Sequence, residues 1–191
     1  MRKNASQLLI FIELILLLFI AVFSACGTGD RQPVSADTLD TMKSRLSCLE
    51  DREEIRRLIT DYGRFLDRRD FKSFALLFAE NDGEWIGGMG KAKGQQAIRR
   101  LMEETIGTDT PEDAPGNFHL FMNDRIDLDG DSATASTKWV FMIQNAAGGP
   151  EPFYLGHYED TMVRENGQWR FLRRVVYSDI PKDNPENGGA E

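Results

Sequence analysis

Apolar side chains recur at helical spacing between positions 39 and 49, and the apolar pattern continues from position 55 to 66. They are Leu39, Met42, Leu46, Leu49, Ile55, Leu58, Ile59, Tyr62, Phe65 and Leu66. The pattern predicts one long amphipathic helix, or two nearly collinear ones, with Asp37 or Thr38 as the N-cap. Shorter helices are predicted over residues 71–78 and 95–106, with a brief strand over 84–86 between them.

From residue 117 the period changes to two, the period of a β-strand. The two predicted faces of the first strand, residues 118–128, are His119, Phe121, Asn123 and Arg125, and Phe118, Leu120, Met122 and Ile126. Further strands are predicted over 133–144, 153–163 and 168–178, and Asn166-Gly167 is a strong hairpin signal. Helices followed by long antiparallel strands predict an α+β fold, with the helices against one face of a curved sheet.

The N-terminus has the features of an export signal. Arg2 and Lys3 precede an almost wholly apolar run, and small residues lead into Cys26. This resembles a bacterial lipoprotein signal, in which Cys26 would carry the lipid; an uncleaved membrane anchor is the alternative. We therefore expect a signal peptide over 1–25, a flexible tether over 26–37, a folded domain over 38–180 and a polar tail over 181–191. The domain would lie in the cell envelope, outside the cytoplasm.

Composition removes several classes of function. The chain has 31 acidic and 23 basic residues, a net charge of −8, which argues against a nucleic-acid partner. Two cysteines do not form a disulfide scaffold, and we interpret Cys48 as a small core residue. The two histidines exclude a three-histidine metal site, although not a His-carboxylate site, and the glycine-rich residues 87–91 lack the spacing of a phosphate-binding loop. We expect no cofactor and no metal.

Eight segments in a fixed order resemble the SnoaL-like branch of the nuclear transport factor two-like superfamily. They are residues 49–59, 66–71, 77–79, 94–98, His119 with Asn123, 130–135, 156–160 and 167–171. The resemblance covers about residues 46–178. It implies a cone in which long helices close over a strongly bent antiparallel sheet. It also implies a pocket for a small apolar organic ligand and a homodimer formed through the outer sheet face.

The resemblance carries a catalytic pair onto this chain. Relatives that act as dehydratases and dehydrochlorinases use an Asp near the end of the first helix and a His on the first long strand, which are here Asp67 and His119. The dehydratase's second histidine falls at about Ile143 and its tyrosine at Leu66, so the dehydrochlorinase-like dyad is the closer match. The pair implies a lyase or isomerase that abstracts a proton; a non-catalytic binding or assembly module of the envelope is the alternative.

Other residues are candidates for binding the substrate. They are Tyr62, Trp85, Phe121, Asn123, Trp139, Phe141, His157 and Arg164, of which Asn123 or Arg164 would steady developing negative charge. Each also has a structural interpretation. Asp67 fits a solvated helix end, His119 a hydrogen-bonded structural histidine, the aromatic residues a core, and His157 a structural residue or a pocket edge. Arg170, Arg173 and Arg174 fit a solvated or salt-bridged sheet face.

Overall fold

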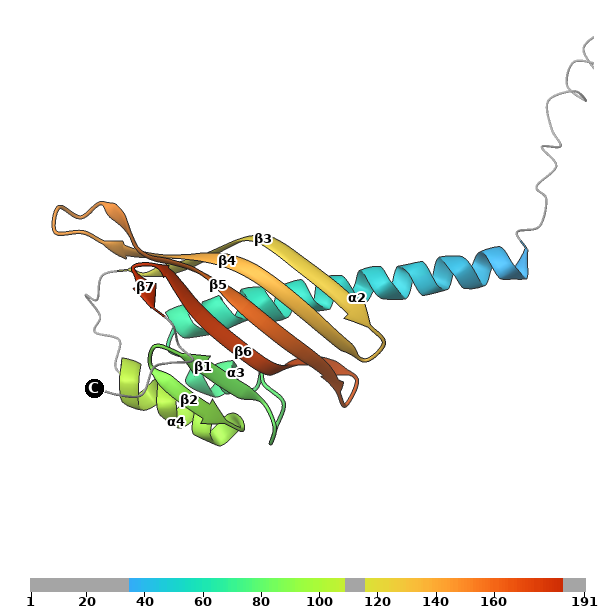
Figure 1. Cartoon of the computed structure of the whole chain (residues 1–191), viewed down its shortest axis with the longest axis horizontal. Coiled ribbons are helices and arrows are strands. Elements are labelled where there is room, and N and C mark those ends of the chain that lie inside the picture. Colours follow the sequence, from blue (N-terminus) through green and yellow to red (C-terminus); the bar gives the residue numbers. More distant parts are fainter. Residues whose placement is uncertain (1–34, 109–115, 184–191) are drawn as a thin grey trace, which may run out of the picture. The chain divides into compact units, whose positions relative to one another are not determined.

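The computed structural model describes residues 35–108 and 116–183 (Figure 1). The predicted signal peptide, Cys26 and most of the predicted tether lie outside these residues. By its internal contacts the chain divides into two units, residues 1–43 and 44–191, and the second contains the sheet and the pocket. No helix among the described residues is both long enough and apolar enough to cross a membrane.

The first described element is one long helix, α2 (Ala36–Asp67), rather than two collinear ones. Its first turn is capped by Ser35, whose hydroxyl accepts a hydrogen bond from the Thr38 N–H at 3.2 Å, so the predicted Asp37 or Thr38 cap is wrong by two or three positions. Burial begins only at Ile55. Cys48 is exposed, which corrects its interpretation as a core residue.

Short elements follow α2. Asp70 caps α3 (Phe71–Ala75) by accepting a hydrogen bond from the Ser73 N–H at 3.0 Å. Strands β1 (Glu84–Gly87) and β2 (Gly90–Lys93) form a hairpin, and α4 (Gln95–Ile106) follows it. Strand β2 has the sequence Gly-Lys-Ala-Lys, which carries no apolar alternation, and for that reason it was not predicted.

The predicted α+β fold with helices on a curved antiparallel sheet is confirmed. The four long strands are β3 (Phe118–Asp129), β4 (Ser132–Gln144), β5 (Pro150–Glu165) and β6 (Gln168–Ile180). The sheet order is β2-β1-β6-β5-β4-β3, with β7 (Lys182–Asp183) paired to β6. Among these described strands, the pairings are antiparallel except that of β1 with β6, which is parallel.

A β-bulge in β3 exchanges the two faces of that strand. The register against β4 shifts between Met122 and Arg125, and Asn123 there has a φ of 55°. Before the bulge Phe118, Leu120 and Met122 are exposed, whereas beyond it Ile126 is buried. The predicted grouping of these four side chains on one face is therefore wrong, because the extra residue reverses the alternation. The exposed three leave an apolar patch on the outer sheet face, and the homodimer through that face stays a prediction.

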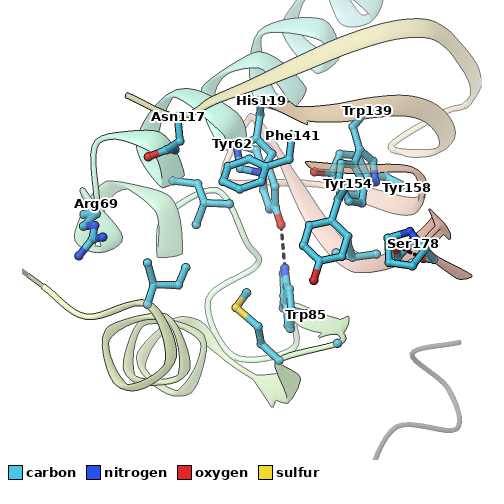
Figure 2. Close-up of a pocket in the computed structure, with 16 residues that line it drawn as sticks. Tyr62, Arg69, Trp85, Asn117, His119, Trp139, Phe141, Tyr154, Tyr158 and Ser178 are labelled. Atoms are coloured by element: carbon cyan, nitrogen blue, oxygen red, sulfur yellow. Dashed lines mark hydrogen bonds between the residues drawn. The ribbon is translucent and has the colours of Figure 1, made fainter. Parts of the chain in front are cut away.

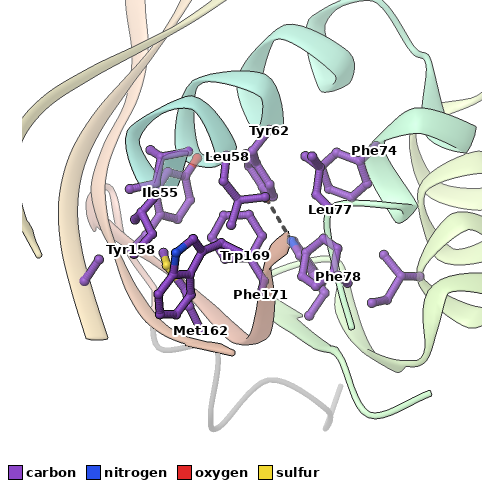
Figure 3. Packing of buried hydrophobic residues seen from close by; sticks show 14 of the residues in the cluster. Ile55, Leu58, Tyr62, Phe74, Leu77, Phe78, Tyr158, Met162, Trp169 and Phe171 are labelled. Carbon is purple, nitrogen blue, oxygen red and sulfur yellow. Dashed lines mark hydrogen bonds between the residues drawn. The ribbon is translucent and has the colours of Figure 1, made fainter. Parts of the chain in front are cut away.

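The core is largely aromatic and lies between α2, α3 and the inner face of the sheet (Figure 3). Tyr62, Phe74, Phe78 and Phe171 pack ring against ring, with centroids 4.8–6.1 Å apart. Offset and edge-to-face contacts at these separations are favourable beyond the area they bury.

A buried ion pair lies within this aromatic core. Arg174 donates two hydrogen bonds of 2.7 Å to the Asp160 carboxylate, and both side chains are inaccessible to solvent. The guanidinium also lies 4.0–4.2 Å from the ring centroids of Tyr62, Tyr158 and Phe171. Of the two predicted settings for Arg174, the salt-bridged one is confirmed and the solvated one is wrong, because a register shift between β5 and β6 turns this side chain inward.

Candidate functional site

A cavity of about 610 Å³ opens beside the C-terminal turn of α2 (Figure 2). Its wall combines Tyr62 and Leu66 of α2, Trp85 of β1 and the inner face of the sheet. From the sheet come His119 of β3, Trp139 and Phe141 of β4, Tyr154 and Tyr158 of β5, and Val176 and Ser178 of β6. A concave site lined by aromatic side chains with a few polar groups suits a small organic molecule.

Asp67 and His119 are in direct contact at the wall of this cavity. The His119 Nδ1 lies 2.6 Å from Asp67 Oδ1. The same carboxylate accepts hydrogen bonds from the His119 backbone N–H at 2.9 Å and from the Asn117 side chain at 3.0 Å. His119 lines the cavity, whereas Asp67 lies behind the imidazole, and their side chains are 11% and 18% exposed. Three hydrogen bonds thus fix the carboxylate, and through it the imidazole.

This contact determines which imidazole nitrogen is free. An ionised carboxylate only accepts hydrogen bonds, so the proton of the neutral ring belongs on Nδ1. The other nitrogen, Nε2, then has a free lone pair, and no hydrogen bond from the described residues reaches it. An imidazole held in this tautomer by a carboxylate is the arrangement of a general base.

A glycine allows helix and strand to approach closely enough for this contact. A Cβ on Gly63, one helical turn before Asp67, would lie 2.6 Å from two ring carbons of Phe121 and 3.1 Å from the His119 Cβ. Both distances are shorter than ordinary carbon contacts of about 3.5–4.0 Å. Because Gly63 has no side chain, β3 packs directly on α2, and the carboxylate at the helix end reaches His119.

Two indoles supply further polar groups. The Trp85 Nε1–H donates to the Tyr62 hydroxyl at 2.8 Å, and burial raises the pKa of Tyr62 to about 12, so its phenol stays neutral (Figure 2). The Trp139 Nε1–H is buried and has no partner among the described residues, although Trp139 lines the cavity. A buried donor without a hydrogen-bond partner is unfavourable.

Five of the predicted site residues lie at the cavity wall: Tyr62, Trp85, His119, Trp139 and Phe141. Phe121 is adjacent, because its ring lies against Gly63 and 6.4 Å from the His119 ring centroid. The four of these residues on β3 and β4 follow from the inner-face alternation of those strands, whereas Tyr62 lies on α2 and Trp85 on β1. Their roles in ligand binding and catalysis stay predictions.

Three predicted ligand contacts lie elsewhere. Asn123 is at the exposed bulge of β3, where the strand changes face. His157 points away from Tyr158, its inward neighbour; its Nδ1 lies 3.0 Å from both oxygens of Asp179, and its ring stacks on Tyr177 at 4.7 Å. Arg164 pairs with Asp51 and lies 4.6 Å from the Trp169 ring. None of the three lines the cavity, so these assignments are corrected.

Other residues of the wall were not predicted. Tyr158 was within reach of the sequence, since it alternates in register with Gly156 and Asp160 on the buried side of β5. Tyr154 has the same parity on β5 and was equally within reach, whereas Asn117 and Arg69 carry no periodic signal, because they lie outside the helices and strands. Within the described residues, no group of three or more His, Cys, Asp or Glu side chains is arranged to hold a metal ion.

Comparison with known proteins agrees with this architecture. A family model described as a SnoaL-like domain matches residues 47–175. An NTF2-like protein with a cystatin-like fold from Novosphingobium aromaticivorans is 29% identical, with a TM-score of 0.68 over 82% of this chain and 100% of that one. A putative scytalone dehydratase from the same organism is 28% identical, with a TM-score of 0.58 over 75% and 97%. An uncharacterised Mycobacterium tuberculosis protein is 25% identical over 72% of this chain and 91% of its own.

Proposed function

Because the chain belongs to the SnoaL-like domain family, we propose that it binds a small, mainly apolar organic molecule in the cavity and abstracts a proton from it. The observation that carries this proposal is the 2.6 Å contact between Asp67 and a histidine that lines the cavity. The reaction class is a lyase or an isomerase. A resemblance to a putative scytalone dehydratase supports the same class.

In the proposed step, Nε2 of His119 takes a proton from a carbon of the substrate. The electron pair of the broken C–H bond either forms a C=C bond as a leaving group departs with its own pair, or shifts within the substrate. The imidazolium then returns its proton to the leaving group or to a second carbon. Asp67 stabilises the imidazolium while it carries that proton.

The substrate is expected to carry an oxygen function near the acidic carbon. If binding exposes the buried Trp139 Nε1–H, this group would donate to that oxygen and stabilise negative charge that develops on it. The aromatic rings of Phe141, Tyr154 and Tyr158 would contact the apolar body of the molecule. The cavity volume of about 610 Å³ fits a molecule of drug-like size or smaller.

The test uses the full chain, extracted in detergent from cells that produce it, and native mass spectrometry to identify a retained small molecule. The molecule and its close analogues then serve as substrates. His119→Gln should lower kcat by about 10²–10⁴, the usual contribution of a positioned base. His157→Gln is the matched control, since His157 also pairs with an aspartate but lies outside the cavity, and it should retain wild-type turnover.

The alternative is a non-catalytic module that only holds its ligand. The predominance of aromatic and aliphatic side chains in the cavity wall favours it, since such a wall binds without reacting. The two functions separate in the same experiment. A ligand that both the wild type and His119→Gln retain with equal affinity and leave unchanged would replace the catalytic proposal with the binding one.

We also propose that Cys26 is acylated and tethers the domain in the cell envelope, at the outer membrane where the host has two membranes. The sequence around Cys26 supports this, and Gly27, rather than an aspartate, favours sorting away from the inner membrane. Cys26→Ser should abolish labelling by a radioactive fatty acid and block removal of the signal peptide. Unchanged labelling of that variant would refute the anchor.

A further inference from the structure

The N-terminal half of α2 carries an apolar stripe that its own domain does not cover. Leu39, Met42, Leu46 and Leu49 are 46%, 59%, 55% and 64% exposed. At about 100° per residue, Leu46 and Leu49 point to roughly the opposite side of the helix from Ile55 and Leu58, which are buried against the domain.

The spacing of the stripe is that of a coiled-coil seam. Its intervals of three, four and three residues place Leu39 and Leu46 at the first (a) position of two successive heptads, and Met42 and Leu49 at the fourth (d) position. A surface helix that packs on a core has a broader stripe that drifts around the helix. A strict three-four repeat is instead satisfied by a second helix with the same repeat.

We propose that this stripe binds the same stripe of a second copy of the chain, as a parallel two-stranded coiled coil. The flanking charges identify the partner. Arg45 is at the seventh (g) position of the first heptad and Glu50 at the fifth (e) position of the second, and a parallel pair brings each Arg45 beside the partner's Glu50. Neither side chain is in an ion pair with any other described residue, so both are available.

The same charges select the direction of pairing. In an antiparallel pair of these two heptads, Arg45 would face Arg45 of the partner subunit, which is repulsive. The neighbouring basic residues do not compete, because Arg52 donates to the Ile126 carbonyl and Arg57 pairs with Glu53. A parallel pair also leaves both N-termini at the same end, as anchoring to one membrane would require.

Two heptads form a weak interface alone. Here the unfavourable free energy of helix nucleation does not weaken the pair, because the C-terminal half of α2 is already held as a helix by the core. Anchoring of both chains to one membrane would raise their effective concentration further. The inference does not rest on the proposed function, since none of its residues lines the cavity.

Disulfide cross-linking of the full chain in intact cells tests the arrangement, with Cys48 replaced by serine as the background. Under a mild oxidant, Leu39→Cys and Leu49→Cys should each give at least about fivefold more dimer than Ser44→Cys, which is on the outer side of the pair. Cross-linking at both positions requires a parallel pair, because in an antiparallel pair each introduced cysteine is far from the same cysteine of the second chain. Dimer levels no higher than those of Ser44→Cys would overturn the proposal.

Charge reversal provides the second measurement. Arg45→Glu and Glu50→Arg should each lower cross-linking through Leu49→Cys by about two- to tenfold, and the double reversal should restore it. Failure of the double variant to recover would overturn the assigned pairing. Two alternatives would give different results. If the stripe binds a membrane surface, Leu39→Cys should be protected from a water-soluble maleimide without forming a dimer. If the chain dimerises through the outer sheet face, cross-linking should be insensitive to both charge reversals.

Discussion

Replacing Gly63 by alanine tests the close approach on which the Asp67–His119 contact depends. At an open position in a helix this substitution stabilises by about 1 kcal/mol, because alanine has less backbone entropy to lose than glycine. Here the new methyl group would lie 2.6 Å from the Phe121 ring and 3.1 Å from the His119 Cβ. Inserting a methyl into such a contact costs about 1–3 kcal/mol.

The two effects together predict a net loss of about 1 kcal/mol, or a melting temperature lower by roughly 2–4 °C. Urea unfolding followed by circular dichroism measures it. The displacement of His119 should also weaken its hydrogen bond to Asp67, which proton NMR detects as loss of the downfield Nδ1–H signal. Phe121→Leu removes the outer ring atoms and should reduce the cost of the alanine when both changes are combined.

Thr60→Ala, at an exposed position of the same helix, is the control and should stabilise by a few tenths of a kcal/mol. If Gly63→Ala stabilises the domain by about 1 kcal/mol and leaves the imidazole signal unchanged, the close packing of β3 on α2 is refuted.

Three further predictions concern stability, and urea unfolding measures each. Asp70→Ala removes the cap of α3 and should lower the free energy of unfolding by about 1 kcal/mol. Hydrogen bonds from Ser73 hold the pKa of Asp70 below its usual value. The difference between the variant and the wild type should therefore be present above about pH 4 and vanish as the pH falls further. Gly156→Ala places a Cβ 2.0 Å from the Tyr177 carbonyl oxygen and should cost more than about 3 kcal/mol, whereas Gly149→Ala, with contacts no closer than 3.4 Å, should cost little. Burial raises the pKa of Tyr62 from 10 to about 12, so the native state holds this proton more tightly than the unfolded chain does. The free energy of unfolding should therefore fall by about 3 kcal/mol between pH 10 and 12. Tyr62→Phe should remove that part of the decline.

The sequence was sufficient for the long elements because their patterns are regular. One helix ending at Asp67 and four long strands follow from periods of 3.6 and 2. It was insufficient wherever one residue interrupts a period. The bulge at Asn123 and the register shift that turns Arg174 inward reverse the faces of β3 and β6, and a bulge has no reliable sequence signal.

The candidate site divides in the same way. His119 and Trp139 lie on the regular part of the sheet, so alternation and the family resemblance brought them to the cavity wall. Helical periodicity gave no reason to place Asp67 at the cavity. The Asp67 carboxylate contacts His119 from behind the cavity wall, and the missing side chain of Gly63 lets α2 and β3 approach closely enough for this contact. The predictions for His157 and Arg164 are wrong because the residue type alone does not indicate which face of the sheet a histidine or an arginine lies on.

The position of β6 has a consequence for how the chain acquires its structure. This strand is the last long one to be synthesised, yet it lies inside the sheet and pairs with β1 and β5. The contacts between Phe78 and Phe171, and between β1 and β6, join parts of the chain about ninety residues apart. Such non-local pairing makes folding slow, and the emerging chain exposes unpaired edges until its end is available. A chain truncated before β6 would therefore be expected to aggregate rather than form a smaller domain, and folding waits for the complete polypeptide.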